Sequence, residues 1–268
     1  MLKKTDVVLK SNRLVEASYR LSLNEQRIIL YAVCRCREED LAFSPDTPIT
    51  ITADAFAKQF PQADKKTNVY RQLKDAMDAL YERSVTINDV DPATGHDRVT
   101  KTRWISTASY IDGAGHVQII FSPKVIPYIA RVEKEFTSYQ LERVSHMTSF
   151  HAIRIYELLS QHRDIRTRQL SLVDLRSYLQ IEPHEYKLTT NLIRKVIDVA
   201  VDQINKHSDL TVSYKSVKTG RAITDFMFKI RDKERKPKAS STPSDQATRE
   251  KLEALGQQRL DTEDTEEF

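Results

Sequence analysis

The strongest constraint in this sequence is an internal repeat, in which one pattern of residues occurs twice at a spacing of 123 positions. In the first half the repeated apolar positions are Val69, Leu73, Ala76 and Met77, and in the second half they are Leu192, Val196, Val199 and Ala200. Two polar positions repeat as well, since Asn68 matches Asn191 and Arg71 matches Arg194. The repeat predicts two domains of one fold, each with a helix that buries the same face.

Each repeated segment is the last of three predicted helices. The first helix begins at Ser22, where Ser22 and Glu25 form a capping box, and its counterpart in the second half begins at Ser149. A short second helix follows at residues 52–60 and 171–181, and each precedes a proline that ends it. Apolar residues recur every three or four positions in these segments, as in helices with one buried face.

Residues after the third helix alternate between apolar and polar, which predicts β-strands in both halves. In the second half, strands at residues 210–214 and 226–230 flank a turn at Gly220. In the first half the predicted strands lie at residues 85–87, 102–110 and 117–121. Three helices and a hairpin form a winged helix, so the sequence predicts an α+β fold of two tandem winged-helix domains with a flexible C-terminal tail.

The predicted boundaries place an N-terminal winged helix at residues 8–145, a C-terminal winged helix at 146–232 and the tail at 233–268. The tail has few large apolar residues to offset the entropy of ordering, and we expect at most a short helix near residues 247–260. It holds seven Lys and Arg against nine Asp and Glu, although the whole chain has a formal net charge of +4. The positive surplus therefore lies in the two domains, as is compatible with a polyanionic partner.

Several classes of protein are excluded by what the sequence lacks. It contains no apolar run long enough to cross a bilayer and no secretory signal, so we expect a protein of the cytoplasm. Cys34 and Cys36 lie two residues apart on a predicted helix, which suits reduced thiols rather than a disulfide or a metal site. The five glycines are too scattered for a phosphate-binding loop, so we expect neither a cofactor nor nucleotide hydrolysis.

The outer face of the third helix in the second half carries side chains that read bases and hold phosphates. Arg and Lys suit guanine, Asn suits adenine, and Thr suits a thymine methyl group or a phosphate. The predicted base-reading residues are Lys187, Thr189, Thr190, Asn191, Arg194 and Lys195. An ordinary solvated helix face is the alternative interpretation of the same residues.

Basic residues also flank the predicted hairpins, which are the wings of such a fold. In the second half, Lys215, Lys218 and Arg221 are expected to contact the DNA backbone or the adjacent minor groove. In the first half we expect milder, less selective DNA contacts from Lys65, Lys66, Asn68, Arg71, Arg98 and Lys101. The sequence thus predicts a protein that binds double-stranded DNA mainly through its second domain.

The sequence disfavours two kinds of DNA-processing enzyme. A nicking enzyme needs a His-apolar-His metal site, and none of the seven histidines forms that pair. A tyrosine recombinase is suggested by the pattern His151-Ala-Ile-Arg154 with Tyr178 and Tyr186 downstream. We expect His151 and Arg154 on the polar side of an amphipathic helix, however, and the spacing arises readily by chance. The prediction is therefore a protein without catalytic residues or bound metal.

Three separated segments resemble one known family, the theta-type (iteron) plasmid replication initiators, which include RepE, the pi protein and RepA. The first segment is VLKSNRLVEASYRLS at residues 8–22, followed by LNEQR at 23–27. The second is IYELL at residues 155–159. The third combines VDQIN, LTVSY, KTGR and FMFKIRD, which start at residues 201, 210, 218 and 226. The likeness spans residues 8–232 and leaves the tail out.

This resemblance implies functions that the periodicities alone could not. Members of the family bind directly repeated origin sites, the iterons, as monomers, and many repress their own promoter as dimers through the first domain. The resemblance also implies host partners, namely DnaA and the replicative helicase. Two alternatives stay open: a winged-helix transcriptional regulator without an initiation role, and a domain pair that docks proteins.

Overall fold

The fold is described from a computed structural model, for residues 6–38, 44–61, 69–91, 93–111, 113–130 and 135–233. The first half contains β1 (Val7–Ser11), α1 (Asn12–Val15), α2 (Leu23–Glu38), β2 (Ile49–Thr52), α3 (Ala53–Gln59), α4 (Val69–Glu82), β3 (Ser84–Val90), β4 (Asp97–Arg103), β5 (Ile105–Ile111), β6 (His116–Phe121), α5 (Ile126–Ile129), β7 (Phe136–Gln140) and α6 (Glu142–Ser145). The second half contains α7 (Phe150–Ser160), β8 (Thr167–Ser171), α8 (Leu172–Leu179), α9 (Thr189–Leu192), the π-helical turn η1 (Ile193–Ile197), α10 (Asp198–His207), β9 (Leu210–Thr219) and β10 (Ala222–Asp232). The predicted tail, from residue 234 on, lies outside the described residues.

Both halves have the predicted winged-helix order, with one strand that the sequence pattern did not reveal. A short strand lies between the first and second helix of each half, and it pairs with the last strand of the hairpin. The resulting antiparallel sheets have the orders β2-β6-β5 and β8-β10-β9. The two halves therefore share a sheet topology as well as a set of helices.

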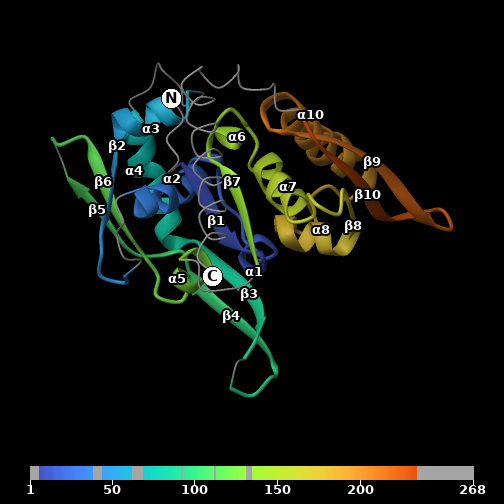
Figure 1. Cartoon of the computed structure of the whole chain (residues 1–268), viewed down its shortest axis with the longest axis horizontal. Helices are drawn as coiled ribbons and strands as arrows, with labels where there is room; N and C mark the ends of the chain where they lie inside the picture. The colour runs from blue at the N-terminus through green and yellow to red at the C-terminus, as the bar shows by residue number, and fades with distance from the viewer. Residues whose placement is uncertain are drawn as a thin grey trace, which may run out of the picture. The chain divides into compact units, whose positions relative to one another are not determined.

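The first half contains an additional hairpin that interrupts this order. Strands β3 and β4 form a separate two-stranded sheet between α4 and β5, and Figure 1 shows them extending away from the helices. The single strand predicted at residues 102–110 is therefore wrong. The chain bends at Trp104, whose side chain is fully buried, so that β4 ends in the additional hairpin and β5 begins in the three-stranded sheet.

The predicted helix starts are confirmed by their hydrogen bonds. The backbone N–H of Ser22 donates to the Glu25 carboxylate at 3.0 Å, and the N–H of Glu25 donates to the Ser22 hydroxyl at 3.3 Å. Thr52, Ser149 and Ser171 cap α3, α7 and α8 through their hydroxyl oxygens in the same way. These bonds satisfy N–H groups that a helix leaves without an internal partner.

The third helix of the second half departs from the repeat because of the π-helical turn. At the spacing of 123, Leu73 and Val196 are both buried, but Val199, the counterpart of the buried Ala76, is 37% exposed. The last buried residues of the two helices, Leu80 and Ile204, are 124 positions apart. A π-turn takes up one extra residue, which shifts every later position on the helix face. The predicted burial of Val199 is therefore wrong.

Helix α7 is buried on all sides, not only along its apolar stripe. Arg154 and Glu157 are both 0% exposed, so the predicted placement of Arg154 on a polar face is wrong. A helix without a solvated face is enclosed by the protein on every side, and α7 packs against β7 and α1 of the first half and against α10 of the second.

A buried network of charges joins α7 to the first half. The ammonium of Lys10 in β1 lies 2.6 Å from the Glu157 carboxylate, which also accepts from Arg154 at 3.1 Å. Arg154 donates to the Tyr19 hydroxyl at 2.6 Å and to the carbonyl oxygens of Val15, Ala17 and Tyr178. Burial raises the pKa of Glu157, but the attraction of both cations outweighs it and holds that pKa below its usual range. The described residues up to Asp232 form one compact unit.

Other predictions from composition can be compared with the same described residues. Cys34 and Cys36 are both buried. Among the residues that the structure describes, no helix has the length and apolar character needed to span a bilayer. No group of three or more His, Cys, Asp or Glu in that part of the chain is arranged to hold a metal ion.

Candidate nucleic-acid interface

The helix that the sequence predicts to read DNA, called the recognition helix below, consists of α9, η1 and α10 in succession. One arginine shapes the turn before it. The guanidinium of Arg176 donates to the carbonyl oxygens of Glu182, Glu185 and Tyr186 at 2.7–3.2 Å. Tyr186 itself has a positive φ of 48°, which a side chain adopts only at a cost. Arg176 therefore fixes the path of the chain into the helix, a role that sequence reasoning missed.

Buried side chains anchor this helix in the core, and its predicted DNA-binding side chains face outward. Leu192, Val196, Ala200 and Ile204 are at most 1% exposed. Of the predicted base-reading residues, Lys187, Thr190, Arg194 and Lys195 are exposed, and Thr189 and Asn191 are half-buried. Among the described residues, none of these cations has a hydrogen bond or ion pair. The face is thus available to an external anion.

Two contacts fix the recognition helix against the wing. The Asn205 side chain donates to the carbonyl oxygen of Val212 at 2.9 Å and accepts from its N–H at 2.6 Å. Earlier on the helix, the Tyr214 hydroxyl donates to Asp198 at 2.5 Å, and the pKa of Tyr214 is raised, first by burial and then by this carboxylate. Helix and hairpin therefore present their surfaces as one rigid element.

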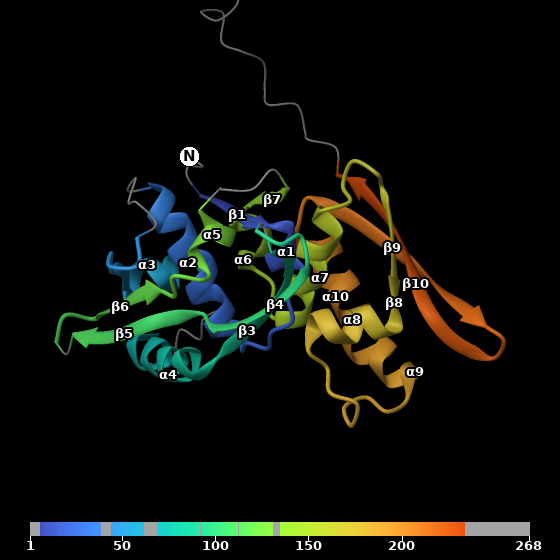
Figure 2. The ribbon, with the colours of Figure 1, turned by 90° about the horizontal axis from the view of Figure 1, so that it is seen from below.

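The wing itself is the hairpin of β9 and β10, closed by a two-residue turn at Gly220 and Arg221. Gly220 has a φ of +62°, which suits a residue without a side chain. Lys215, Lys218 and Arg221 are all exposed, and within the described part of the chain they have no hydrogen-bond or ion-pair partner. Figure 2 shows this hairpin reaching beyond the helices to a free tip.

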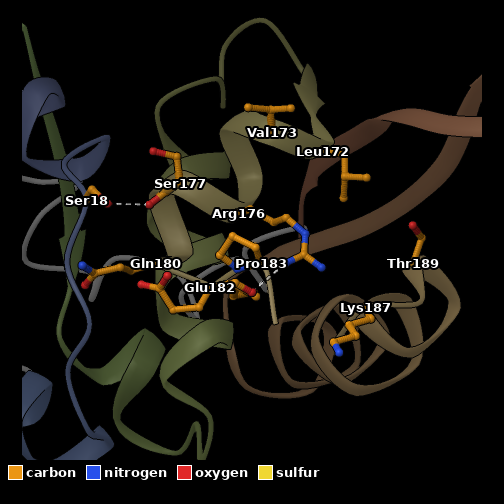
Figure 3. Close-up of a pocket in the computed structure, with 11 residues that line it drawn as sticks. Ser18, Leu172, Val173, Arg176, Ser177, Gln180, Glu182, Pro183, Lys187 and Thr189 are labelled. Atoms are coloured by element: carbon orange, nitrogen blue, oxygen red, sulfur yellow. Dashed lines mark hydrogen bonds between the residues drawn. The ribbon is translucent and has the colours of Figure 1, made fainter. Parts of the chain in front are cut away.

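A hollow of about 580 Å³ opens between α8 and the start of the recognition helix. Leu172, Val173, Lys187 and Thr189 line it, and Figure 3 shows Arg176 between α8 and the segment that carries Lys187 and Thr189. At its inner edge the Ser18 hydroxyl donates to the carbonyl oxygen of Ser177 at 2.8 Å. The hollow thus lies beside the face that we predicted to read DNA.

The first domain holds its predicted DNA-binding residues differently. Lys65, Lys66 and Asn68 lie outside the described residues. Arg98 lies on β4 of the additional hairpin, where it binds Asp89 at 2.7 Å and Asp91 at 3.1 Å. Hydrogen bonds from Arg98 lower the pKa of Asp89 below its usual range. Arg71 is exposed but has a partner within the protein, whereas Lys101 is exposed and has none among the described residues.

The recombinase pattern is not supported by the geometry. Arg154 donates to a tyrosine and three backbone carbonyl groups and has no exposed surface, so it cannot reach a phosphate. His151 lies next to the Arg20–Glu185 ion pair, and burial lowers its pKa to about 4. Arg154 and the Arg20–Glu185 ion pair instead join the two halves of the molecule.

Comparisons with known proteins match both domains of this chain. A model described as "Initiator Replication protein, WH1" matches residues 7–160, and one described as "Initiator Rep protein, WH2" matches residues 171–230. The crystal structure of the pi initiator protein in complex with iteron DNA has a TM-score of 0.70 at 18% identity, over 87% of this chain and 100% of that one. An uncharacterized 27.6 kDa protein of Escherichia coli is 25% identical over 237 residues, which are 87% of this chain and 98% of its own.

The fold of two tandem winged helices is confirmed by these likenesses, as is the resemblance to the theta-type plasmid initiators. The first model alone covers more than half of the chain, and the second follows it in the expected order. The chain therefore belongs to the family of initiator replication proteins, with a WH1 domain followed by a WH2 domain.

Proposed function

We propose that this replication initiator binds iteron DNA, the direct repeats of a plasmid origin, and reads it with its second winged helix. The observation that carries the proposal is the surface of the recognition helix and wing, where Lys187, Arg194, Lys195, Lys215, Lys218 and Arg221 are exposed and have no internal partner among the described residues. Support also comes from the pi initiator protein, which shares this fold and whose structure contains iteron DNA.

Within this proposal the two domains have unequal roles. Thr189, Thr190, Asn191 and the neighbouring cations of the recognition helix read base edges, while the wing holds the backbone. The first domain, through Lys65, Lys66, Asn68, Arg71, Arg98 and Lys101, contributes weaker backbone contacts. Arg98 contributes least, because its two carboxylate partners already neutralise it.

The finer points of the proposal come from the resemblance to the family. The chain binds iterons as a monomer in the bacterial cytoplasm and represses its own promoter as a dimer through the first domain. DnaA and the replicative helicase are its host partners. The domain limits, residues 8–145 and 146–232, are part of the same proposal.

Footprinting on the plasmid segment that flanks the gene tests this function. We expect protection of tandem direct repeats by the monomer, at intervals of about two helical turns on one face of the DNA. Melting of a neighbouring AT-rich segment distinguishes an initiator from a simple transcriptional regulator. Protection of a single palindrome without melting would favour the regulator.

A substitution on the recognition helix tests the base-reading role. Arg194→Ala is expected to lose about 1–3 kcal/mol of binding free energy and to relax the sequence preference. Lys206→Ala, at the exposed far end of the same helix, serves as the matched control and should leave binding unchanged. Equal losses on specific and random DNA for Arg194→Ala would refute the role.

A further inference from the structure

The recognition helix begins at a residue that neither caps it nor is shielded from water. Leu188 occupies the N-cap position, makes no side-chain hydrogen bond there and is 64% exposed. Helices α2, α3, α7 and α8 begin instead at a serine or threonine whose hydroxyl accepts a backbone N–H bond. The short helices α5 and α6 also begin without a side-chain cap, but their N-cap residues Val125 and Leu141 are buried, so the exposure of Leu188 distinguishes it from both.

This leucine has no evident role in folding. A hydroxyl or amide side chain at the N-cap stabilises a helix by accepting one of its free N–H groups, and leucine cannot accept. An apolar side chain in water contributes no burial to the core either. Natural sequences tend to break local rules at functional sites, where another requirement is stronger.

The surroundings of Leu188 suit one kind of ligand. Lys187 precedes it and Arg194 and Lys195 follow on the helix, all exposed and without an internal partner among the described residues. Across the neighbouring hollow lies Val173, which is 76% exposed (Figure 3). An exposed apolar side chain with free cations before and after it in the sequence fits a polyanion that also has an apolar group, and the thymine C5-methyl group is the apolar group on the major-groove edges of bases.

We infer that Leu188 contacts a thymine methyl group in the major groove and is a specificity-determining residue of this initiator. The inference rests on the proposed function and adds to it a residue chosen for apolar contact rather than for hydrogen bonding. It predicts that the protein distinguishes thymine from uracil at one position of its site, although the two bases pair identically.

The experiment uses the full-length protein and a duplex selected by that protein from random sequence. Each thymine of the duplex is replaced in turn by deoxyuridine, which removes only the methyl group, and affinity is measured by fluorescence anisotropy. We expect the wild type to lose about tenfold at one position. Leu188→Ser should bind the unmodified duplex about tenfold more weakly and show no further loss with deoxyuridine there.

Thermal unfolding separates this effect from damage to the fold. Serine is a favourable N-cap residue, so Leu188→Ser should unfold at the same or a higher temperature than the wild type while it binds DNA less well. Ile165→Ser is the matched control, because Ile165 is 65% exposed in the same domain, outside the recognition helix. It should leave both the affinity and the uracil sensitivity unchanged.

Four results would overturn the inference. If the selected duplex binds but no deoxyuridine weakens it, or if Leu188→Ser keeps the full uracil sensitivity, Leu188 reads no methyl group while the proposed function stands. If Leu188→Ser weakens binding to specific and random DNA equally, the residue contacts the DNA backbone instead. If selection returns no preferred sequence at all, the proposed function fails together with the inference.

Discussion

The two long hairpins of this protein carry similar cations but hold them differently. On the β3–β4 hairpin, Arg98 is bound by Asp89 and Asp91. On the β9–β10 hairpin, the cations have no partner among the described residues: Lys215, Lys218 and Arg221. A cation with an internal partner must give up that ion pair before it can bind a phosphate, whereas a free one only loses water. Counting charge by segment therefore overstates what the first hairpin offers to DNA.

The largest expected effect concerns stability, and it tests whether the two halves, whose surfaces differ, unfold together. Glu157→Ala leaves Lys10 and Arg154 buried without the carboxylate that both bind, and should lower the free energy of unfolding by about 3–5 kcal/mol. Because the network joins both halves, we expect one urea transition, with coincident signals from circular dichroism and from the fluorescence of Trp104, the only tryptophan. Glu142→Ala, at an exposed site, is the control. Unfolding of one half alone would contradict the shared network.

A second test concerns the pH dependence of the contact between the halves. The pKa of His151 is lowered to about 4, first by burial and then by Arg20, so the unfolded chain binds a proton more readily between pH 6.5 and pH 4. Stability should therefore fall as the pH decreases through this range, by at most about 3 kcal/mol from this group. His151→Gln should show a smaller fall in urea melts at pH 7 and pH 4.5. His96→Gln, in an exposed turn, should behave as the wild type.

An effect of intermediate size, on the salt dependence of DNA affinity, is expected from the wing cations. Lys215→Ala and Lys218→Ala should each reduce the slope of log affinity against log salt by about 0.9, equally for specific and random duplexes. A change in sequence preference would assign them to base reading and remove the distinction between wing and recognition helix. Affinity titrations at several salt concentrations measure the slope.

The smallest expected effect is at Arg98. Arg98→Ala should leave DNA affinity within about twofold, because the side chain is already paired. Lys101→Ala, three positions along the same strand, removes a cation with no partner among the described residues and should lower the salt slope more. An effect of Arg98→Ala as large as that of Lys218→Ala would break the comparison between the hairpins.

Sequence reasoning succeeded where the determining interactions are local. The capping box at Ser22, the cap at Ser149 and the alternation of the β9–β10 hairpin depend on residues a few positions apart, and all three are confirmed. The exposed faces of the recognition helix and wing follow from the same periodicity. Their roles in binding DNA stay predictions.

Sequence reasoning failed where contacts between distant parts of the chain determine the structure. Strands β2 and β8 are only four and five residues long and are held by pairing with β6 and β10, so their short alternation did not by itself predict a strand. Arg154 was expected on a polar face because it lies off the apolar stripe that contains Ala152 and Ile155. Its partners Tyr19, Val15 and Ala17 lie more than 130 positions away. The bend at Trp104 likewise depends on two separate sheets.

The π-helical turn at Ile193–Ile197 holds one residue more than an ordinary helical turn. Removing one residue there would restore an ordinary helix in which the buried Val196 and Ile204 lie seven positions apart, as Leu73 and Leu80 do in α4. In evolutionary terms, the turn corresponds to a one-residue insertion that the helix absorbed locally, so the residues before and after it keep their buried faces.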